Sequence, residues 1–155
     1  MFMEMRRADR KLPEERARLI LAEGEYGVLS TVGENGYPYG VPVNYVFMRE
    51  KIYFHCANGV GHKLENVRHC PKVSFTVVGK TEIMPARFGT KYESVIAFGS
   101  AAEVLEEKRQ ALEKLIEKYS PDYREAGQRY IDDAIARTAV YSIEVEHITG
   151  KACGG

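Results

Sequence analysis

The dipeptide Asn35-Gly36 separates two β-forming runs, and this arrangement constrains the fold more than any other feature of the sequence. The two runs cover residues 26–32 and 37–47. Asn-Gly between such runs is the strongest short signal of a β-hairpin. A connection this short joins antiparallel neighbours, because parallel strands need a crossover of about a dozen residues. The hairpin therefore excludes a doubly wound fold, which would need a helix between each pair of strands.

The rest of the hydrophobic pattern predicts further strands and helices. Strands are expected at residues 52–56, 72–79, 92–104 and 141–147, and helices at 12–23, 62–69, 106–119 and 123–137. Residues 1–11 are expected to form a polar arm, 80–91 an irregular segment and 150–155 a tail. Antiparallel strands joined mainly by short turns commonly close into a barrel, because closure removes exposed edges. We therefore expect an α+β fold with a small antiparallel six-stranded β-barrel and flanking helices.

Length and charge narrow the class of protein. A chain of 155 residues has the usual size of one domain, so we expect a single domain over 1–155. Basic and acidic residues number 22 each, whereas a nucleic-acid-binding protein usually shows a basic excess. No apolar run approaches the roughly 18 residues of a membrane span. We therefore expect neither a nucleic-acid partner nor a membrane.

The cysteines and histidines indicate a reduced compartment and no metal. Three cysteines form no C-x-x-C pair, and the N-terminus has no apolar signal-peptide core. An odd cysteine count without an export signal is typical of reduced thiols, which predicts a cytoplasmic location. The four histidines and three cysteines also lack the spacing of a metal site. We therefore expect no bound metal.

Residues 52–68 form the strongest candidate binding segment, with a strand, a glycine loop and a helix that starts at His62-Lys63. A helix N-terminus offers free N–H groups and the positive end of the dipole. Glycines let the backbone approach an anion closely, and Lys63 adds a full charge. The segment therefore fits a phosphate. An ordinary glycine turn with a solvated Lys63 fits the same residues.

Four further side chains are candidates with two interpretations each. Ser30 and Thr31 precede a tight turn, where their hydroxyls reach the same anion or face solvent. Asn44 lies close to Pro42, which cannot donate a hydrogen bond to a β-ladder. Unpaired backbone groups near Asn44 could therefore hydrogen-bond to the edge of a flat heteroaromatic ring. Alternatively, Asn44 hydrogen-bonds to a neighbouring loop. His55 transfers protons near neutral pH or is a barrel histidine bonded to backbone.

Together these segments resemble the FMN-binding split-barrel family related to pyridoxamine 5′-phosphate oxidase, and within it the 5-nitroimidazole-resistance (Nim) type. The segments that carry the resemblance are YGVLST (26–31), GYPYGVPVNY (36–45), IYFHCA (52–57), GHK (61–63), PKVSF (71–75), YESVIAFG (92–99) and ITGK (148–151). They span nearly the whole chain in family order. The resemblance implies a homodimer of split barrels with FMN in a cleft between subunits.

The resemblance also implies which residues bind FMN. The phosphate contacts are implied to be His62 and Lys63 with Ser30 or Thr31. The ring edge is implied to lie along Val43, Asn44 and Tyr45. The ribityl and ring region is implied to contact His55, Cys56 and Ala57. The remaining implied contacts are Ser94, from a later strand, and Lys151, from the tail.

The resemblance implies an FMN-dependent reductase that acts on small flat acceptors such as nitroaromatics and 5-nitroimidazoles, with His55 as the catalytic residue. The family's pyridoxamine phosphate oxidases carry Trp and Arg in a C-terminal segment, whereas this chain has no Trp. The resemblance therefore does not extend to oxidation of pyridoxamine phosphate. The alternatives are a non-catalytic flavin carrier or sensor, a flavin-free dimer, and a split barrel linked to deazaflavin F420 or haem.

Overall fold

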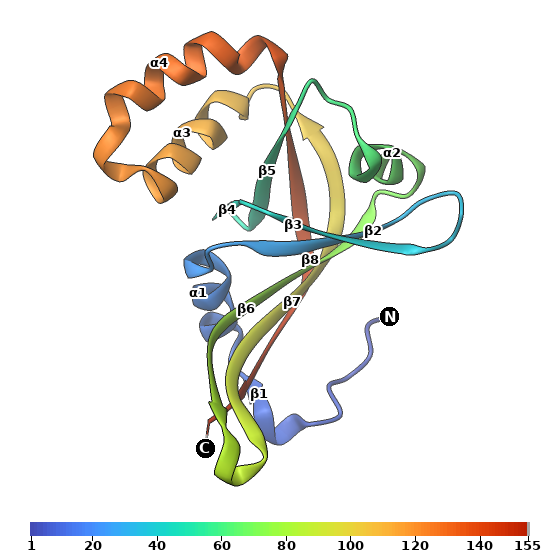
Figure 1. The fold of residues 1–155 in the computed structure, drawn as a ribbon. Coiled ribbons are helices and arrows are strands. Elements are labelled where there is room, and N and C mark those ends of the chain that lie inside the picture. Colours follow the sequence, from blue (N-terminus) through green and yellow to red (C-terminus); the bar gives the residue numbers. More distant parts are fainter. Residues whose placement is uncertain (155) are drawn as a thin grey trace.

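The structure is a computed structural model, and it describes residues 1–154. Within this range the fold is α+β, with eight strands in one antiparallel sheet (Figure 1). The strands are β1 (Lys11–Leu12), β2 (Gly27–Val32), β3 (Pro38–Val43), β4 (Val46–Met48), β5 (Lys51–Ala57), β6 (Lys72–Met84), β7 (Gly89–Val104) and β8 (Thr138–Cys153). The α-helices are α1 (Glu14–Glu23), α2 (His62–His69), α3 (Lys108–Tyr119) and α4 (Arg124–Ala134).

The predicted hairpin is confirmed. β2 pairs antiparallel with β3, and Val32 lies opposite Pro38. Gly36 has a φ of 77°, in the left-handed region that glycine adopts most readily. The Asn35 side chain closes the turn by accepting a hydrogen bond from the Tyr37 amide at 3.0 Å.

The prediction of an α+β fold is confirmed, and the fold is consistent with a split barrel, but the expected number of six strands and the closure of the barrel were wrong. The sheet order is β3-β2-β6-β7-β8-β5-β4, and β1 pairs with β8, so the eight described strands form a sheet that does not close. The predicted strand 37–47 is divided into β3 and β4, which lie at opposite ends of the sheet. Between Val43 and Val46 the chain crosses from one end to the other, so the sheet curves without a closing ladder.

The division falls at Tyr45 because its backbone groups bond to side chains of α3. The Tyr45 amide donates to the Tyr119 hydroxyl at 3.1 Å, and Lys118 Nζ donates to the Tyr45 carbonyl at 2.9 Å. The ammonium also lies 3.9 Å from the centre of the Tyr45 ring. Burial in this position lowers the pKa of Lys118 to about 8. The end of α3 therefore satisfies the backbone that a continuous strand would pair.

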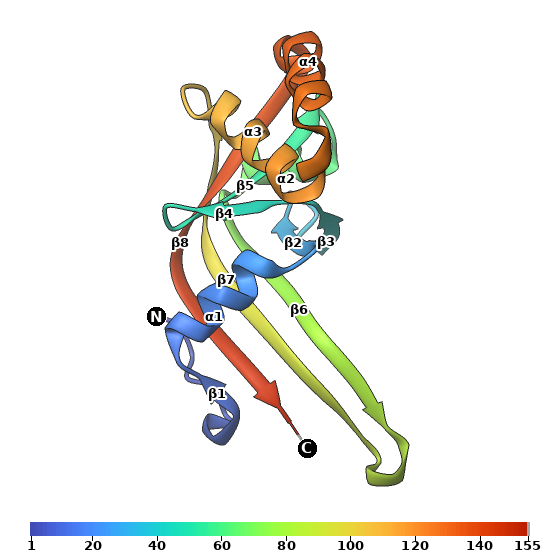
Figure 2. The ribbon, with the colours of Figure 1, turned by 90° about the vertical axis from the view of Figure 1, so that its left-hand side faces the viewer.

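The expectation of an irregular segment at 80–91 was also wrong. β6 and β7 continue as a long hairpin that ends at the pair Met84–Gly89, with a register shift between Val78 and Thr81. Figures 1 and 2 show this hairpin extending away from the rest of the sheet. Residues near its end are exposed on both faces, so the sequence there has no alternation to mark a strand. The predicted tail is partly regular as well, since β8 runs to Cys153.

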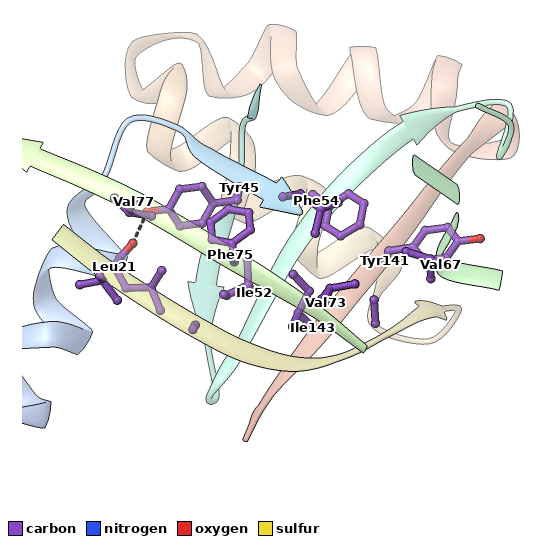
Figure 3. Close-up of a cluster of buried hydrophobic side chains, with 14 of the residues drawn as sticks. Leu21, Tyr45, Ile52, Phe54, Val67, Val73, Phe75, Val77, Tyr141 and Ile143 are labelled. Atoms are coloured by element: carbon purple, nitrogen blue, oxygen red, sulfur yellow. Dashed lines mark hydrogen bonds between the residues drawn. The ribbon is translucent and has the colours of Figure 1, made fainter. Parts of the chain in front are cut away.

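The main core lies between α1 and the curved sheet. Figure 3 shows Tyr45 and Phe75 packed edge to face, with ring centres 4.8 Å apart. The Tyr45 hydroxyl donates to the carbonyl of Leu21 in α1, which fixes that helix against the crossing segment. A second apolar cluster packs α3 and α4 against β4, β5 and β8, and it includes Tyr53, Leu115 and Ile131. The α3–α4 hairpin is thus a second layer at one end of the sheet (Figure 1).

Candidate functional site

A cavity of about 490 Å³ lies where the end of β5, the start of α2 and the α3–α4 hairpin meet. It has a polar part and an apolar part. The polar part is lined by Asn44, His55, Cys56, Ala57, Asn58, Lys63, Ser120, Arg137 and Thr138. The apolar part is lined by Leu112, Leu115, Ile116, Tyr119, Tyr130, Ile131, Ala134 and Ile135. A volume of this size is typical of a small-molecule site.

The glycine loop after β5 forms a corner of the cavity that is suited to binding an anion. Asn58 and Gly59 have φ angles of 57° and 60°, and Gly61 has a φ of 129°, which L side chains rarely adopt. The loop is held by Arg68, whose Nη2 donates to the Gly59 carbonyl at 2.8 Å. α2 then begins at His62; the Leu64 and Glu65 amides donate to the Gly61 carbonyl at 3.1 Å, so the amides of His62 and Lys63 are the ones without a partner in the helix. Half-buried Lys63 lines the cavity beside these amides. The corner therefore combines a positively charged ammonium with free backbone N–H donors.

His55 faces the cavity from β5, opposite Val140 of β8 in the ladder. Its side chain is open to the cavity, but the surrounding protein partly desolvates it. This desolvation, together with the positive charge of Lys63, lowers the pKa of His55 below 6.5. The imidazole is therefore mainly neutral at pH 7.

Cys56 lies beside His55 and is buried. Burial raises the pKa of the Cys56 thiol, although Lys63 opposes part of this effect. The thiol is therefore protonated at neutral pH and packs as a small apolar group.

The structure brings five of the predicted site residues into this cavity, namely Asn44, His55, Cys56, Ala57 and Lys63. Val43 and Tyr45 instead pack in the main core. The His62 ring stacks on Tyr39 with centres 4.0 Å apart, which directs it away from the cavity lining. Only Asn44 of the crossing segment is therefore available to a ligand here.

Ser30 and Thr31 line a separate cavity of about 320 Å³. The Thr31 hydroxyl is buried and accepts a hydrogen bond from Asn66 Nδ2 at 3.0 Å. Thr31 thus joins β2 to α2 within this chain. Ser94 and Lys151 are paired between β7 and β8, and they line a third cavity of about 300 Å³ with Met3 and Met5. One copy of the chain does not bring these residues together with Lys63.

Sequence reasoning missed the apolar wall of the cavity and Arg137. Leu112 and Ile116 of α3 have the helical spacing of a core-facing stripe, and with Ile131 of α4 they contribute to both the second apolar cluster and the wall. A stripe on one helix does not distinguish these two uses. Arg137 follows α4 and joins β8, and nothing in its sequence context distinguishes it from a surface arginine.

A sequence profile over most of the chain identifies the family to which this fold belongs. The profile of the pyridoxamine 5′-phosphate oxidase family matches residues 13–152, and the chain belongs to this family. No curated protein is similar enough to extend this comparison.

Solved structures share the fold at low identity. A candidate 5-nitroimidazole antibiotic resistance protein from Bacteroides thetaiotaomicron is 23% identical, with a TM-score of 0.75 over 92% of this chain and 86% of that one. The flavocytochrome Anf3 from Azotobacter vinelandii is 19% identical, with a TM-score of 0.82 over 98% and 73%. An FAD- and haem-binding protein from Mycobacterium smegmatis is 15% identical, with a TM-score of 0.78 over 94% and 74%. At these identities the similarity establishes the fold alone.

The described residues also bear on whether the chain could hold a metal or cross a membrane. Among residues 1–154, no three His, Cys, Asp or Glu side chains are grouped so as to hold a metal ion. In the same part of the chain, no helix has both the length and the apolar character needed to cross a membrane.

Proposed function

We propose that this protein is an FMN-dependent reductase of small flat acceptors such as nitroaromatics, active as a cytoplasmic homodimer. The observation that carries the proposal is the convergence of Lys63, His55 and Asn44 on one cavity. The family assignment supports it, as do the solved structures described as flavin-binding or as linked to nitroimidazole resistance.

The phosphate is assigned to the corner formed by the glycine loop and the first turn of α2. Gly61 has a φ of 129°, and its ideal Cβ position meets no atom within 4 Å, so this corner is open. Lys63 supplies the charge, and the first amides of α2 supply neutral donors. These groups match a phosphate monoester, which accepts several hydrogen bonds and carries about two negative charges.

The ring and the reaction are assigned to the middle of the cavity. When bound, FMN supplies the electron transfer, as flavins do. Asn44 offers an amide to the edge of a flat heterocycle, and neutral His55 offers one N–H donor and one acceptor. Desolvation and, to a lesser extent, the Lys63 charge lower the His55 pKa, and a phosphate bound near Lys63 would offset only the second of these. In this proposal the protonated form of His55 donates its proton to the acceptor.

The homodimer is assigned from the β6–β7 hairpin and from the position of Ser94 and Lys151. The hairpin exposes five large apolar side chains: Val78 (57%), Ile83 (75%), Phe88 (98%), Ile96 (41%) and Phe98 (38%). Large exposed apolar side chains along one element are of the kind that a protein interface would cover. A second copy on this surface would cover it and bring the partner's strands toward a shared site.

Spectroscopy followed by turnover tests the proposal. The purified protein is expected to show a flavin absorbance spectrum, and released cofactor is expected to behave as FMN. Anaerobic assays with a 5-nitroimidazole and pre-reduced protein then test reduction. A colourless protein that binds no FMN would overturn the proposal. The absorbance spectrum of haem or F420 would show that the cofactor is not FMN. Bound FMN that passes no electrons to any acceptor would indicate a carrier or sensor.

A further inference from the structure

We propose that the α3–α4 side of this cavity is a separate subsite for a flat, mostly apolar molecule with one carboxylate, and that Arg137 binds that carboxylate. The inference deepens the proposed function, since it names the chemical class of acceptor that would lie beside the flavin. It depends on three features of the cavity: an apolar wall, one fixed guanidinium and the absence of acidic lining.

The apolar wall is preformed. Leu112, Leu115 and Ile131 are buried, and they line the cavity at one edge of the second apolar cluster. Helices α3 and α4 pack so closely that a Cβ at Gly127 would lie 2.5 Å from Ile116 Cγ2. A wall that is fixed in this way binds a flat apolar ligand with little ordering cost.

The helix hairpin is also held together by charge. Arg109 Nη2 contacts Asp132 Oδ1 at 2.8 Å and Gln128 Oε1 at 3.0 Å, which joins the exposed faces of α3 and α4. This cross-link lies outside the cavity lining, so it stabilises the wall without placing a carboxylate in the site.

Arg137 lies on the same side as the wall. Its Nη1 donates to the carbonyl of Asp133 in the last full turn of α4, at 2.6 Å, so the side chain folds back along that helix. Its own carbonyl accepts from the Asn58 amide at 2.7 Å, which fixes its backbone to the end of β5. Among the described residues, no carboxylate lies within 4.0 Å of its guanidinium. The remaining donors are therefore available to a ligand.

Arg137 and Lys63 come from different elements of the cavity lining. Lys63 lies in the first turn of α2, whereas exposed Arg137 lies between α4 and β8, with its side chain folded back along α4. No Asp or Glu is present among the described residues that line the cavity. The lining therefore disfavours a cation and favours an anion, and Arg137 supplies a positive charge in addition to that of Lys63.

Ligand titrations of the FMN-loaded protein test the subsite. The probes are para-nitrobenzoate, para-nitrobenzyl alcohol and para-nitrobenzylamine, which share a ring and differ in charge. Calorimetry is expected to show that the benzoate binds most tightly and the amine most weakly. Arg137→Gln is expected to lower the affinity for the benzoate by about tenfold or more, because a charge-assisted hydrogen bond to a carboxylate is lost. Its affinity for the alcohol is expected to stay within a few-fold of that of the parent protein.

Arg129→Gln is the matched control, because Arg129 is an exposed arginine of α4 that does not line the cavity. It is expected to bind all three probes as the parent does. Thermal unfolding of both variants checks that the hairpin remains folded. Equal effects of the two substitutions on benzoate binding would contradict a specific role for Arg137.

The outcome is separable from that of the proposed function. If Arg137→Gln lowers the affinity for FMN itself, or if benzoate displaces FMN, Arg137 belongs to the flavin site and the inference is wrong. If the protein binds no FMN at all, the same titrations on the flavin-free protein still test the subsite. Failure of the benzoate to bind in either form, or equal affinity for the amine, would also overturn the inference.

Discussion

At the residue scale, the electrostatics of the cavity bear most directly on His55, the proposed proton donor. Its pKa is lowered by partial desolvation and by Lys63, so the protonated form that donates to an acceptor is scarce in the free protein at pH 7. The rate of a step that uses this proton must therefore fall as the pH rises through the His55 pKa. If phosphate binds near Lys63 as proposed, we expect this fall in rate to shift to higher pH, because the phosphate offsets the Lys63 contribution to the lowered pKa.

We predict that His55→Gln slows nitro reduction by at least about tenfold, because general acid catalysis contributes on the order of 10²–10⁴-fold. Glutamine keeps similar size and hydrogen bonding but does not titrate, so the pH limb is expected to disappear while FMN affinity stays within a few-fold. Single-turnover oxidation of pre-reduced protein, measured anaerobically against pH, separates this step from product release. An unchanged rate and pH profile would remove His55 from the mechanism.

At the scale of elements, the Thr31–Asn66 hydrogen bond joins β2 to α2 and so positions the helix that carries Lys63. Both side chains are buried, with exposed fractions of 1% and 5%. Thr31→Val keeps the shape but leaves the Asn66 amide without its acceptor. We predict a loss of about 1–3 kcal/mol in the free energy of unfolding, measured by urea denaturation. Thr31→Ser retains the hydroxyl and is expected to lose less; an equal loss would contradict this role of the bond.

The elements that could be predicted are those with a strong local signal. Helix α2 has the predicted bounds His62–His69, and Asn35-Gly36 correctly marks the β2–β3 hairpin. The division at Tyr45 was not predictable, because it depends on Lys118 and Tyr119, which lie far along the chain. The long β6–β7 hairpin was missed because its exposed end has no buried face to set an alternation.

The candidate site shows the same contrast. His55 and Lys63 were identified because a strand, a glycine loop and a helix are contiguous in sequence, and the structure places both at one cavity. Thr31 and Tyr45 were assigned by position, but their polar groups have partners inside the chain that only the folded structure shows. Their implied contacts with FMN stay predictions.

At the scale of the whole molecule, the β6–β7 hairpin exposes large apolar side chains, which the proposed homodimer would cover. We predict a mass near twice 17.5 kDa by light scattering at micromolar concentration. Ile96→Glu places a charge in the proposed interface and is expected to shift the protein toward 17.5 kDa. Leu105→Glu is the control, because Leu105 is 76% exposed but lies beyond the end of β7. A parent protein that is entirely monomeric would contradict the shared site.

The central claim is that the corner at Lys63 holds the phosphate of FMN, and paired titrations with FMN and riboflavin test it most directly. Lys63→Ala is expected to lower the affinity for FMN by about 10- to 100-fold, because a charge-assisted contact to phosphate is lost. The affinity for riboflavin, which has no phosphate, is expected to be almost unchanged. Lys72→Ala is the control, since Lys72 lines the separate cavity with Ser30 and Thr31. Unchanged FMN affinity in Lys63→Ala, or a loss of FMN in Lys72→Ala instead, would contradict the account.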